Sequence, residues 1–369
     1  MAVDVEERTF SEVKRLCYAG LDGPVLLDEV IKRLRRAVPF EAYCASTMDP
    51  ASGLLTHPIS DEMGGAKEAA IFFERIYFEH DLKLYKQMAQ SHRAVARLSE
   101  TAGGRLERSL RYLELLGPLG LAHEMRGVFG AGGYLWGSMD LIREKGRPDY
   151  GPRQVALLRR IAPHLGSGLK TAALRTQAPV NPTGADVPGV LTIDGSGRVV
   201  QHTAAAERWL RELEDLGPGW REWAGLPPTL RMAMVVLRRA LRPERERDTE
   251  SIPRLRARTR SGRWLTLYGS LTEATPERRA ETVIVIEPTK PEELLPFSMI
   301  SYGLSAREEE VVGLIVRGLS TAQISRTLYI SEYTVQNHLR NVFEKVGVRS
   351  RGELVRRLFF DNLYPTLFE

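Results

Sequence analysis

The chain has 369 residues, of which 43% are hydrophobic and 27% are charged, the composition of a globular protein with room for two or three domains. Its formal net charge of +5 suits an anionic partner such as a nucleic acid, although a basic balance alone does not identify one. With two cysteines, no basic-then-apolar signal segment and no apolar run of membrane length, the sequence argues against a disulfide-bonded or membrane protein, and we expect a cytoplasmic location.

The first segment, residues 1–174, mixes helical and strand patterns. Apolar residues that recur every three or four positions predict helices over 10–21, 25–38, 67–78, 104–116 and 151–174. Alternating or continuous apolar runs predict strands over 40–48, 124–129 and 133–143, with a turn at 49–53 that leads into a further strand. This order predicts an antiparallel sheet with helices packed around it.

The last part of this segment carries a resemblance to a known fold. Tyr134-Leu-Trp-Gly-Ser-Met-Asp-Leu-Ile-Arg, then Pro148-Asp-Tyr, then Leu157-Leu-Arg-Arg-Ile-Ala-Pro-His-Leu resembles a GAF-like sensory domain, which implies a pocket above one sheet face. The candidate lining residues are Phe40, Tyr43, Phe73, Tyr77, Tyr85, Met125 and Trp136. Aromatic residues fill cores whether or not a ligand binds, so a purely structural role remains an alternative.

A second, smaller segment follows a linker. Residues 175–188 are rich in proline and polar residues, which indicates a linker. Within 189–287 we predict a hairpin around Asp194-Gly195-Ser196-Gly197, helices over 204–213 and 231–241, and strands over 254–260, 264–271 and 282–287. This order resembles a PAS-like sensor module. The segment has no cysteine and His202 is its only histidine, so no haem or flavin cofactor is expected. Residues 288–300 form a second linker.

The final segment, 301–369, contains repeated helix-start signals. Ser305 with Glu308, Ser320 with Gln323, and Ser350 with Glu353 each fit the capping box, in which the two side chains satisfy free N–H groups at a helix start. Ser331 is a fourth serine at the same kind of position. These signals predict four short helices, over 306–317, 321–328, 332–346 and from just after Ser350 to about 360.

The third of these helices has two different faces. Val335, Leu339, Val342 and Val346 fall at helical spacing and face a small core, together with apolar residues of the other helices. Thr334, Gln336, Asn337, Arg340 and Asn341 lie on the opposite face. Glutamine and asparagine can form paired hydrogen bonds with adenine, and arginine with guanine, so this face is suited to a DNA major groove.

These residues also identify a family resemblance. The run Leu304-Ser-Ala-Arg-Glu, Gly318-Leu-Ser, Thr334-Val-Gln-Asn-His-Leu and Lys345-Val-Gly-Val-Arg-Ser-Arg resembles the LuxR-type helix-turn-helix of bacterial transcription regulators. The resemblance implies that Gln336, Asn337 and Arg340 enter the major groove, that Thr334, Lys345 and Arg349 contact phosphates, and that the fourth helix is a dimer contact. Thr321, Gln323 and Ser331 complete the set expected at DNA. Ser325, where the family has alanine, and Tyr333, in a variable position, are the two departures.

The sequence therefore predicts a multidomain α+β protein, with GAF-like and PAS-like antiparallel-sheet domains before an all-α helix-turn-helix domain. We expect a DNA-binding transcriptional regulator that acts as a homodimer on double-stranded DNA and is controlled through its N-terminal domains by a small-molecule signal or a partner. RNA polymerase is a possible further partner. No catalytic motif, metal-ligand set or cofactor motif is present. Two alternatives remain open: a sigma-like subunit of RNA polymerase, and an enzyme or metabolite-binding protein with a helical tail.

Overall fold

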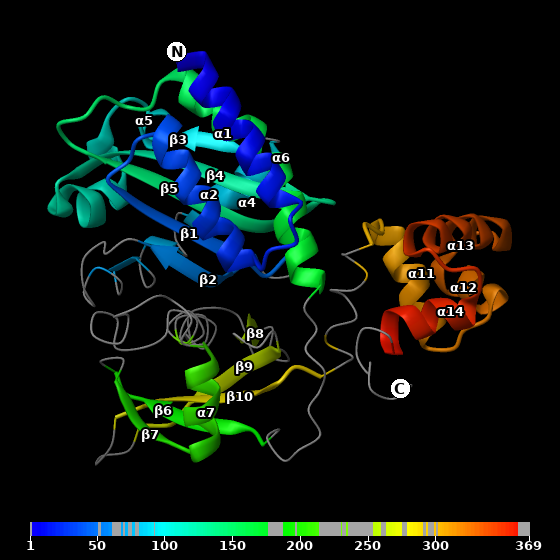
Figure 1. Ribbon diagram of the computed structural model, residues 1–369. Coiled ribbons are helices and arrows are strands. Elements are labelled where there is room, and N and C mark those ends of the chain that lie inside the picture. The colour runs from blue at the N-terminus through cyan, green and yellow to red at the C-terminus, as the bar shows by residue number, and fades with distance from the viewer. Residues whose placement is uncertain are drawn as a thin grey trace. The chain divides into compact units, whose positions relative to one another are not determined.

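The computed structural model describes two five-stranded sheets and a C-terminal group of helices (Figure 1). The described residues are 2–50, 53–60, 68, 71–72, 76–77, 81–91, 93–175, 187–195, 198–213, 230, 234, 254–259, 263–274, 279–290, 293, 299 and 302–360. The predicted mixture of antiparallel sheets and a helical C-terminal region is confirmed.

The first sheet has the strand order β2-β1-β5-β4-β3. Its strands are β1 (Ala42–Met48), β2 (Leu55–Ser60), β3 (Val95–Arg97), β4 (Leu121–Ala131) and β5 (Tyr134–Glu144). Strand β1 pairs antiparallel with both β2 and β5. The strands predicted over 40–48, 124–129 and 133–143 are thus confirmed with shifted ends, whereas β3 was missed because a three-residue strand is too short to show a period.

Three helices cover one face of this sheet. They are α1 (Ala2–Cys17), α2 (Gly23–Ala37) and α6 (Pro152–Arg175), and α6 packs on β4 and against α1 and α2. The contact between α6 and β4 is close: a Cβ atom added at Gly166 would lie 2.2 Å from the carbonyl oxygen of Gly130. Only glycine allows the helix and strand backbones to approach this far. Gly137 of β5 faces the same helix, because a Cβ atom added at Gly137 would lie 2.6 Å from a side-chain carbon of Leu169 in α6.

The opposite face of the sheet lies under α4 (Leu82–Gln90), α5 (Leu98–Thr101) and short 3-10 and π-helical turns at Leu106–Arg108, Tyr112–Leu116 and Gly117–Leu119. These turns replace the single helix expected over 104–116. Helix α4 was not predicted, and much of the helix expected over 67–78 lies outside the described residues.

Five charged side chains are buried together on this opposite face. They are Asp81, Arg111, Glu124, Arg126 and Asp140, and each is at most 3% exposed. Both arginines bind Asp81 at 2.7 Å. They also bind Glu124, Arg111 at 2.6 Å and Arg126 at 2.7 Å. Asp81 and Glu124 are therefore each held by two guanidinium groups. We call these five residues the buried charge cluster.

Asp140 is the carboxylate that the cluster satisfies least. Its closest arginine contact is 3.2 Å, to Arg111, and its other partner is the hydroxyl of Tyr85 at 3.1 Å. Three carboxylates face two guanidinium groups, so one negative charge is unbalanced when all are ionised. Burial, the neighbouring Glu124 carboxylate and this imbalance raise the pKa of Asp140 to about 7.

Replacing Asp140 with asparagine should flatten the pH dependence of stability. An aspartate in the unfolded chain titrates near 3.8, below the folded pKa of about 7, so Asp140 contributes stability that is complete at low pH and is lost as pH rises through 7. Thermal unfolding of the full chain at pH 5, 6.5 and 8 measures this. Asp28→Asn on the surface of α2 is the control, and equal slopes in Asp140→Asn and wild type would contradict the expectation.

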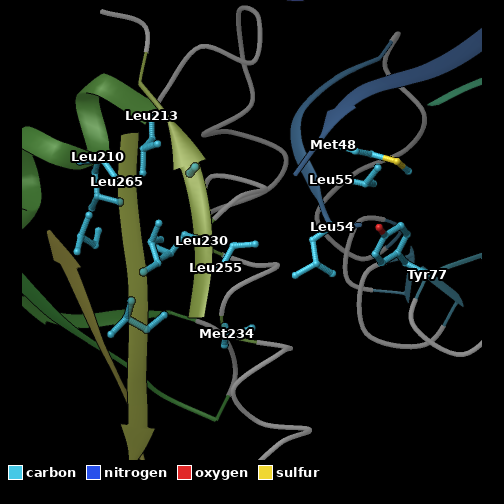
Figure 2. Packing of buried hydrophobic residues seen from close by; sticks show 14 of the residues in the cluster. Met48, Leu54, Leu55, Tyr77, Leu210, Leu213, Leu230, Met234, Leu255 and Leu265 are labelled. Carbon is cyan, nitrogen blue, oxygen red and sulfur yellow. The ribbon is translucent and has the colours of Figure 1, made fainter. Parts of the chain in front are cut away.

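The second sheet has the order β7-β6-β10-β9-β8. Its strands are β6 (Gly189–Ile193), β7 (Val199–His202), β8 (Arg254–Arg258), β9 (Trp264–Leu271) and β10 (Thr282–Pro288). Helix α7 (Ala204–Leu213) packs on β6 and β10. Leu210 and Leu213 of α7, Leu255 of β8 and Leu265 of β9 are buried in its apolar core (Figure 2). The predicted hairpin, the first helix and the three late strands are confirmed here. The helix expected over 231–241 lies outside the described residues apart from Met234.

The C-terminal helices are α11 (Ala306–Val316), α12 (Thr321–Leu328), α13 (Glu332–Val346) and α14 (Arg351–Val355), and a π-helical turn continues α14 over Arg356–Phe360. The four predicted helices are confirmed to within a residue or two. Their core is the predicted one: Val311, Ile324, Val335, Leu339, Val342 and Leu354 are each at most 2% exposed. The apolar tail after residue 360 lies outside the described residues.

Candidate nucleic-acid interface

Serine caps position each helix of the C-terminal group. The hydroxyls of Ser305, Ser320, Ser331 and Ser350 accept hydrogen bonds from backbone N–H groups three residues on, as the sequence predicts. The reciprocal bonds of the capping box are present at Ser305 and Ser320. Helix α13 ends at Gly347, whose φ of 74° lies in the left-handed region. Local sequence therefore fixes both ends of α13.

The turn between α12 and α13 has an unusual backbone. Tyr329 caps α12 at φ 54° and is the one non-glycine residue with positive φ among the described residues. The hydroxyl of Ser325 donates to the carbonyl oxygen of Ile330 within this turn. Alanine at position 325 could not make that bond, so the departure from the family pattern gives this turn an additional hydrogen bond.

The outward face of α13 carries the side chains suited to base edges. Gln336 and Arg340 are exposed and Asn337 is half-buried, whereas Val335, Leu339 and Val342 on the other side are buried. This division of faces is the predicted one. We use the term outward face for Gln336, Asn337, Arg340 and Asn341. The helix thus offers amide and guanidinium groups to a partner while its apolar side holds it in the core.

Thr321 links three helices at the edge of this face. Its hydroxyl accepts a hydrogen bond from the side-chain amide of Gln336 at 3.3 Å and another from the guanidinium of Arg351 at 2.8 Å. Arg351 also donates to the carbonyl oxygen of Leu319 at 3.1 Å. Arg351 therefore holds the start of α12 against α14, a role that the sequence analysis missed because the contact joins residues 30 positions apart.

Thr334 and Ser331 are joined at the start of α13. Their hydroxyl oxygens are 2.8 Å apart, and the Ser331 hydroxyl also accepts from the backbone N–H of Thr334 at 3.1 Å. Gln323 is exposed, and its side-chain carbonyl accepts from the backbone N–H of Ser320 at 2.8 Å. Arg349 is exposed in the turn that follows α13. The candidate phosphate contacts thus lie at both ends of α13 and at the start of α12.

Lys345 is engaged within the protein. Its ammonium group lies 2.6 Å from the Glu308 carboxylate and donates to the carbonyl oxygen of Gly303 at 3.2 Å. Burial of Glu308 disfavours its charged form, but hydrogen bonds from Lys345 and Ser305 outweigh burial and hold the pKa of Glu308 below its usual value. A phosphate contact by Lys345 stays a prediction, and it requires the ammonium group to be shared with Glu308.

The aromatic residues expected to line a pocket do not share one face of the first sheet. Tyr43 is paired with Leu141 and Cys44 with Asp140, so Tyr43 and Asp140 point to opposite faces. Tyr85, whose hydroxyl donates to Asp140, lies on the face of the buried charge cluster with its ring near that of Tyr77, whereas Tyr43 lies on the α6 face. Successive side chains along β1 and β5 point to opposite faces of the sheet, so Tyr43 and the residues around Asp140 are on different sides of it.

Phe40 lies just before β1 and is buried. Its ring is edge-on to that of Tyr43, with 6.0 Å between the ring centroids, and the guanidinium of Arg35 lies over it. The ring N–H of Trp136 donates to the carbonyl oxygen of Ala131 at 2.9 Å. The hydroxyl of Tyr77 donates to the carbonyl oxygen of Gly53 at 3.2 Å. Met125 is fully buried, and Phe73 lies outside the described residues. Each candidate pocket residue that the structure describes is therefore buried or in contact with another residue of the protein.

Within the described ranges no helix has the length and apolarity to cross a membrane. The same part of the chain holds no group of histidine, cysteine or carboxylate side chains that could bind a metal ion.

A capped pair of helices, α12 and α13, joined by a tight turn and presenting amide and guanidinium groups on the second helix, defines a helix-turn-helix DNA-binding domain. Residues 303–358 match the sequence family described as "Bacterial regulatory proteins, luxR family". The spore germination protein GerE of Bacillus subtilis is 44% identical over 55 residues, which are 15% of this chain and 74% of GerE. The chain belongs to the luxR family of bacterial regulatory proteins.

A longer relative matches over a short stretch of its length. The monoamine regulon transcriptional regulator of Klebsiella aerogenes is 45% identical over 64 residues, which are 17% of this chain and 28% of that regulator.

Solved structures also show distant likenesses. The ligand-binding domain of VqsR from Pseudomonas aeruginosa is 12% identical, with a TM-score of 0.32, and the match covers 46% of this chain and 98% of that domain. VqmA of Vibrio cholerae, in a complex with ligand and DNA, is 19% identical, with a TM-score of 0.24, over 48% of this chain and 85% of VqmA. These scores are too low to establish a common fold.

Proposed function

We propose that this protein is a transcriptional regulator that binds a short inverted repeat of double-stranded DNA as a homodimer. Helix α13 enters the major groove, Arg340 pairs with a guanine, and Gln336 and Asn337 pair with adenines. The observation that carries this proposal is the outward face of α13, held between a serine cap and Gly347 on a buried apolar stripe. A further set of side chains contacts the phosphates of the DNA backbone and fixes the position of the protein along the duplex. The set is Thr321, Gln323, Ser331, Thr334, Lys345 and Arg349.

The dimer contact falls on α14 and the segment after it. Two copies of a helix-turn-helix domain related by a two-fold axis place their second helices one DNA turn apart, about 34–36 Å. The half-site spacing is therefore a geometric consequence of the dimer.

The two sheet regions form the control part of the protein. We assign residues 1–174 to a GAF-like domain and 189–287 to a PAS-like domain, joined by linkers at 175–188 and 288–300, with 301–369 as the DNA-binding domain. The order of strands and helices in each region supports this assignment. Either domain receives a small-molecule signal or a protein partner. RNA polymerase is a separate candidate partner of the regulator, and the protein works in the cytoplasm, where the chromosome lies.

Selection of genomic DNA fragments by purified full-length protein, sequenced at two salt concentrations, tests this function. We expect enrichment of a palindrome whose half-sites lie about one helical turn apart. Because phosphate contacts release counterions, total binding should fall at high salt while the preference for the palindrome persists. Binding only in the presence of RNA polymerase would favour a sigma-like subunit. Equal recovery of all sequences at both salt concentrations would overturn the proposal.

A further inference from the structure

Two tyrosines beside the start of α13 are unusually exposed. Tyr329 is 95% exposed and Tyr333 is 74% exposed, the highest values among the large hydrophobic side chains in the described part of the chain. Single exposed apolar side chains are ordinary on protein surfaces, so the position of these two tyrosines in the fold decides whether their exposure has a function. Tyr333 belongs to the first turn of α13, and Tyr329 belongs to the preceding turn.

Tyr333 shares a helix face with the residues proposed to contact bases. Counting from Tyr333, Gln336, Asn337 and Arg340 lie three, four and seven positions on, the spacing that puts side chains on one side of a helix. Val335, Leu339 and Val342 lie on the other side and are buried. Tyr333 therefore lies on the same side of α13 as the outward face, nearer the N-terminus of the helix, and the N-terminal residues of a recognition helix are those that contact base edges.

We infer that Tyr333 is a specificity-determining residue whose ring packs against the C5-methyl group of a thymine in the major groove. This inference rests on the proposed function. The major groove offers mostly hydrogen-bonding atoms, and the thymine methyl group is the apolar surface among them. A phenol ring on the groove side of α13 complements that methyl group and loses its exposed area on binding. Tyr333 thereby adds an apolar contact to the polar ones of Gln336, Asn337 and Arg340.

Deoxyuridine substitution tests this contact directly. The probe is a duplex carrying the most enriched sequence from the genomic selection, with each thymine in turn replaced by deoxyuridine, which lacks only the methyl group. We expect one substitution per half-site to weaken binding by wild-type protein about three- to fivefold, the effect of removing one methyl group from an apolar contact. Tyr333→Ala removes the contact from both half-sites, so it should bind the unmodified duplex more weakly by about the square of that factor. It should also be insensitive to the deoxyuridine substitution, when Kd is measured by fluorescence anisotropy at fixed salt.

Two further variants separate the ring from other causes. Tyr333→Phe keeps the ring and should retain both the affinity and the deoxyuridine effect. Tyr329→Ala removes a still more exposed tyrosine that is not on α13, and it should keep the deoxyuridine effect. Because Tyr333 is exposed, Tyr333→Ala should unfold at the wild-type temperature, which circular dichroism can verify.

Three outcomes overturn the inference while leaving the proposed function intact. The first is a wild-type protein that is indifferent to every deoxyuridine. The second is a Tyr333→Ala protein that keeps the full deoxyuridine effect. The third is a Tyr333→Phe protein as weak as Tyr333→Ala, which would assign the contact to the hydroxyl group and a phosphate. A wild-type protein with no preferred sequence would overturn both the inference and the proposed function.

Discussion

Replacement of Arg111 by alanine is expected to lower the local stability of the first sheet by about 3–5 kcal/mol, the usual cost of breaking a buried ion pair. The guanidinium of Arg111 contacts Asp81 at 2.7 Å, Glu124 at 2.6 Å and Asp140 at 3.2 Å, and none of these side chains is more than 3% exposed. Without Arg111, three carboxylates share Arg126 alone. Water cannot solvate them, so the variant must take up protons or open the sheet.

Hydrogen exchange measured by mass spectrometry on peptides of β4 and β5 reports this loss, because it gives the opening free energy of a chosen region in a protein of several parts. Arg153→Ala, at the exposed start of α6, is the matched control and should leave exchange in these strands unchanged. A change below about 1 kcal/mol in Arg111→Ala would show that the buried charge cluster is solvated, since surface ion pairs have that magnitude.

Replacement of Arg340 by alanine is expected to weaken binding to the selected palindrome by about 1–3 kcal/mol, the range measured for loss of one bidentate base contact. Arg340 is exposed at the middle of α13, one turn beyond Gln336, and its partner base would be a guanine. The Arg340→Ala variant should lose affinity for the palindrome and bind random DNA of the same length nearly as well as the wild-type protein does. Competition titrations with both duplexes, at two salt concentrations, measure the difference.

Arg349→Ala is the comparison variant, because it removes the same charge from the turn that follows α13. It should weaken binding to every sequence alike and reduce the salt slope by about one. Lys345→Ala should have the same uniform effect if Lys345 contacts a phosphate, but its bond to Glu308 makes it a poorer comparison. Identical behaviour of Arg340→Ala and Arg349→Ala on both duplexes would show that Arg340 makes no base contact.

The helix-turn-helix domain was predictable because its information is local. Each helix begins at a serine whose partner is three residues away, and the apolar spacing of α13 falls within one helix. The contacts that were missed are not local. Arg351 reaches Thr321 from another helix, and the bond from Lys345 to Glu308 joins α13 to α11. Sequence patterns place charged residues on the surface, so ion pairs between elements leave no signal.

In the first sheet, contacts between residues distant in the sequence were even harder to predict. Strand and helix positions were largely predictable from periodicity, but the pocket set mixed two faces because the register between β1 and β5 is a tertiary property. The buried charge cluster was not foreseen at all. Asp81, Arg111 and Asp140 lie on separate elements, and arginine and aspartate are rarely buried unless paired.

The buried charge cluster also constrains how this protein can diverge. Loss of Asp81, Arg111, Glu124 or Arg126 leaves oppositely charged members without their partner, so the first step of most substitution paths is unfavourable. Two kinds of substitution avoid this cost. One replaces two oppositely charged members of the cluster together, and the other replaces Asp140 by a neutral residue, which removes the unbalanced charge. We therefore expect descendants of this sequence to keep Asp81, Arg111, Glu124 and Arg126 or to lose them together, and to vary first at Asp140.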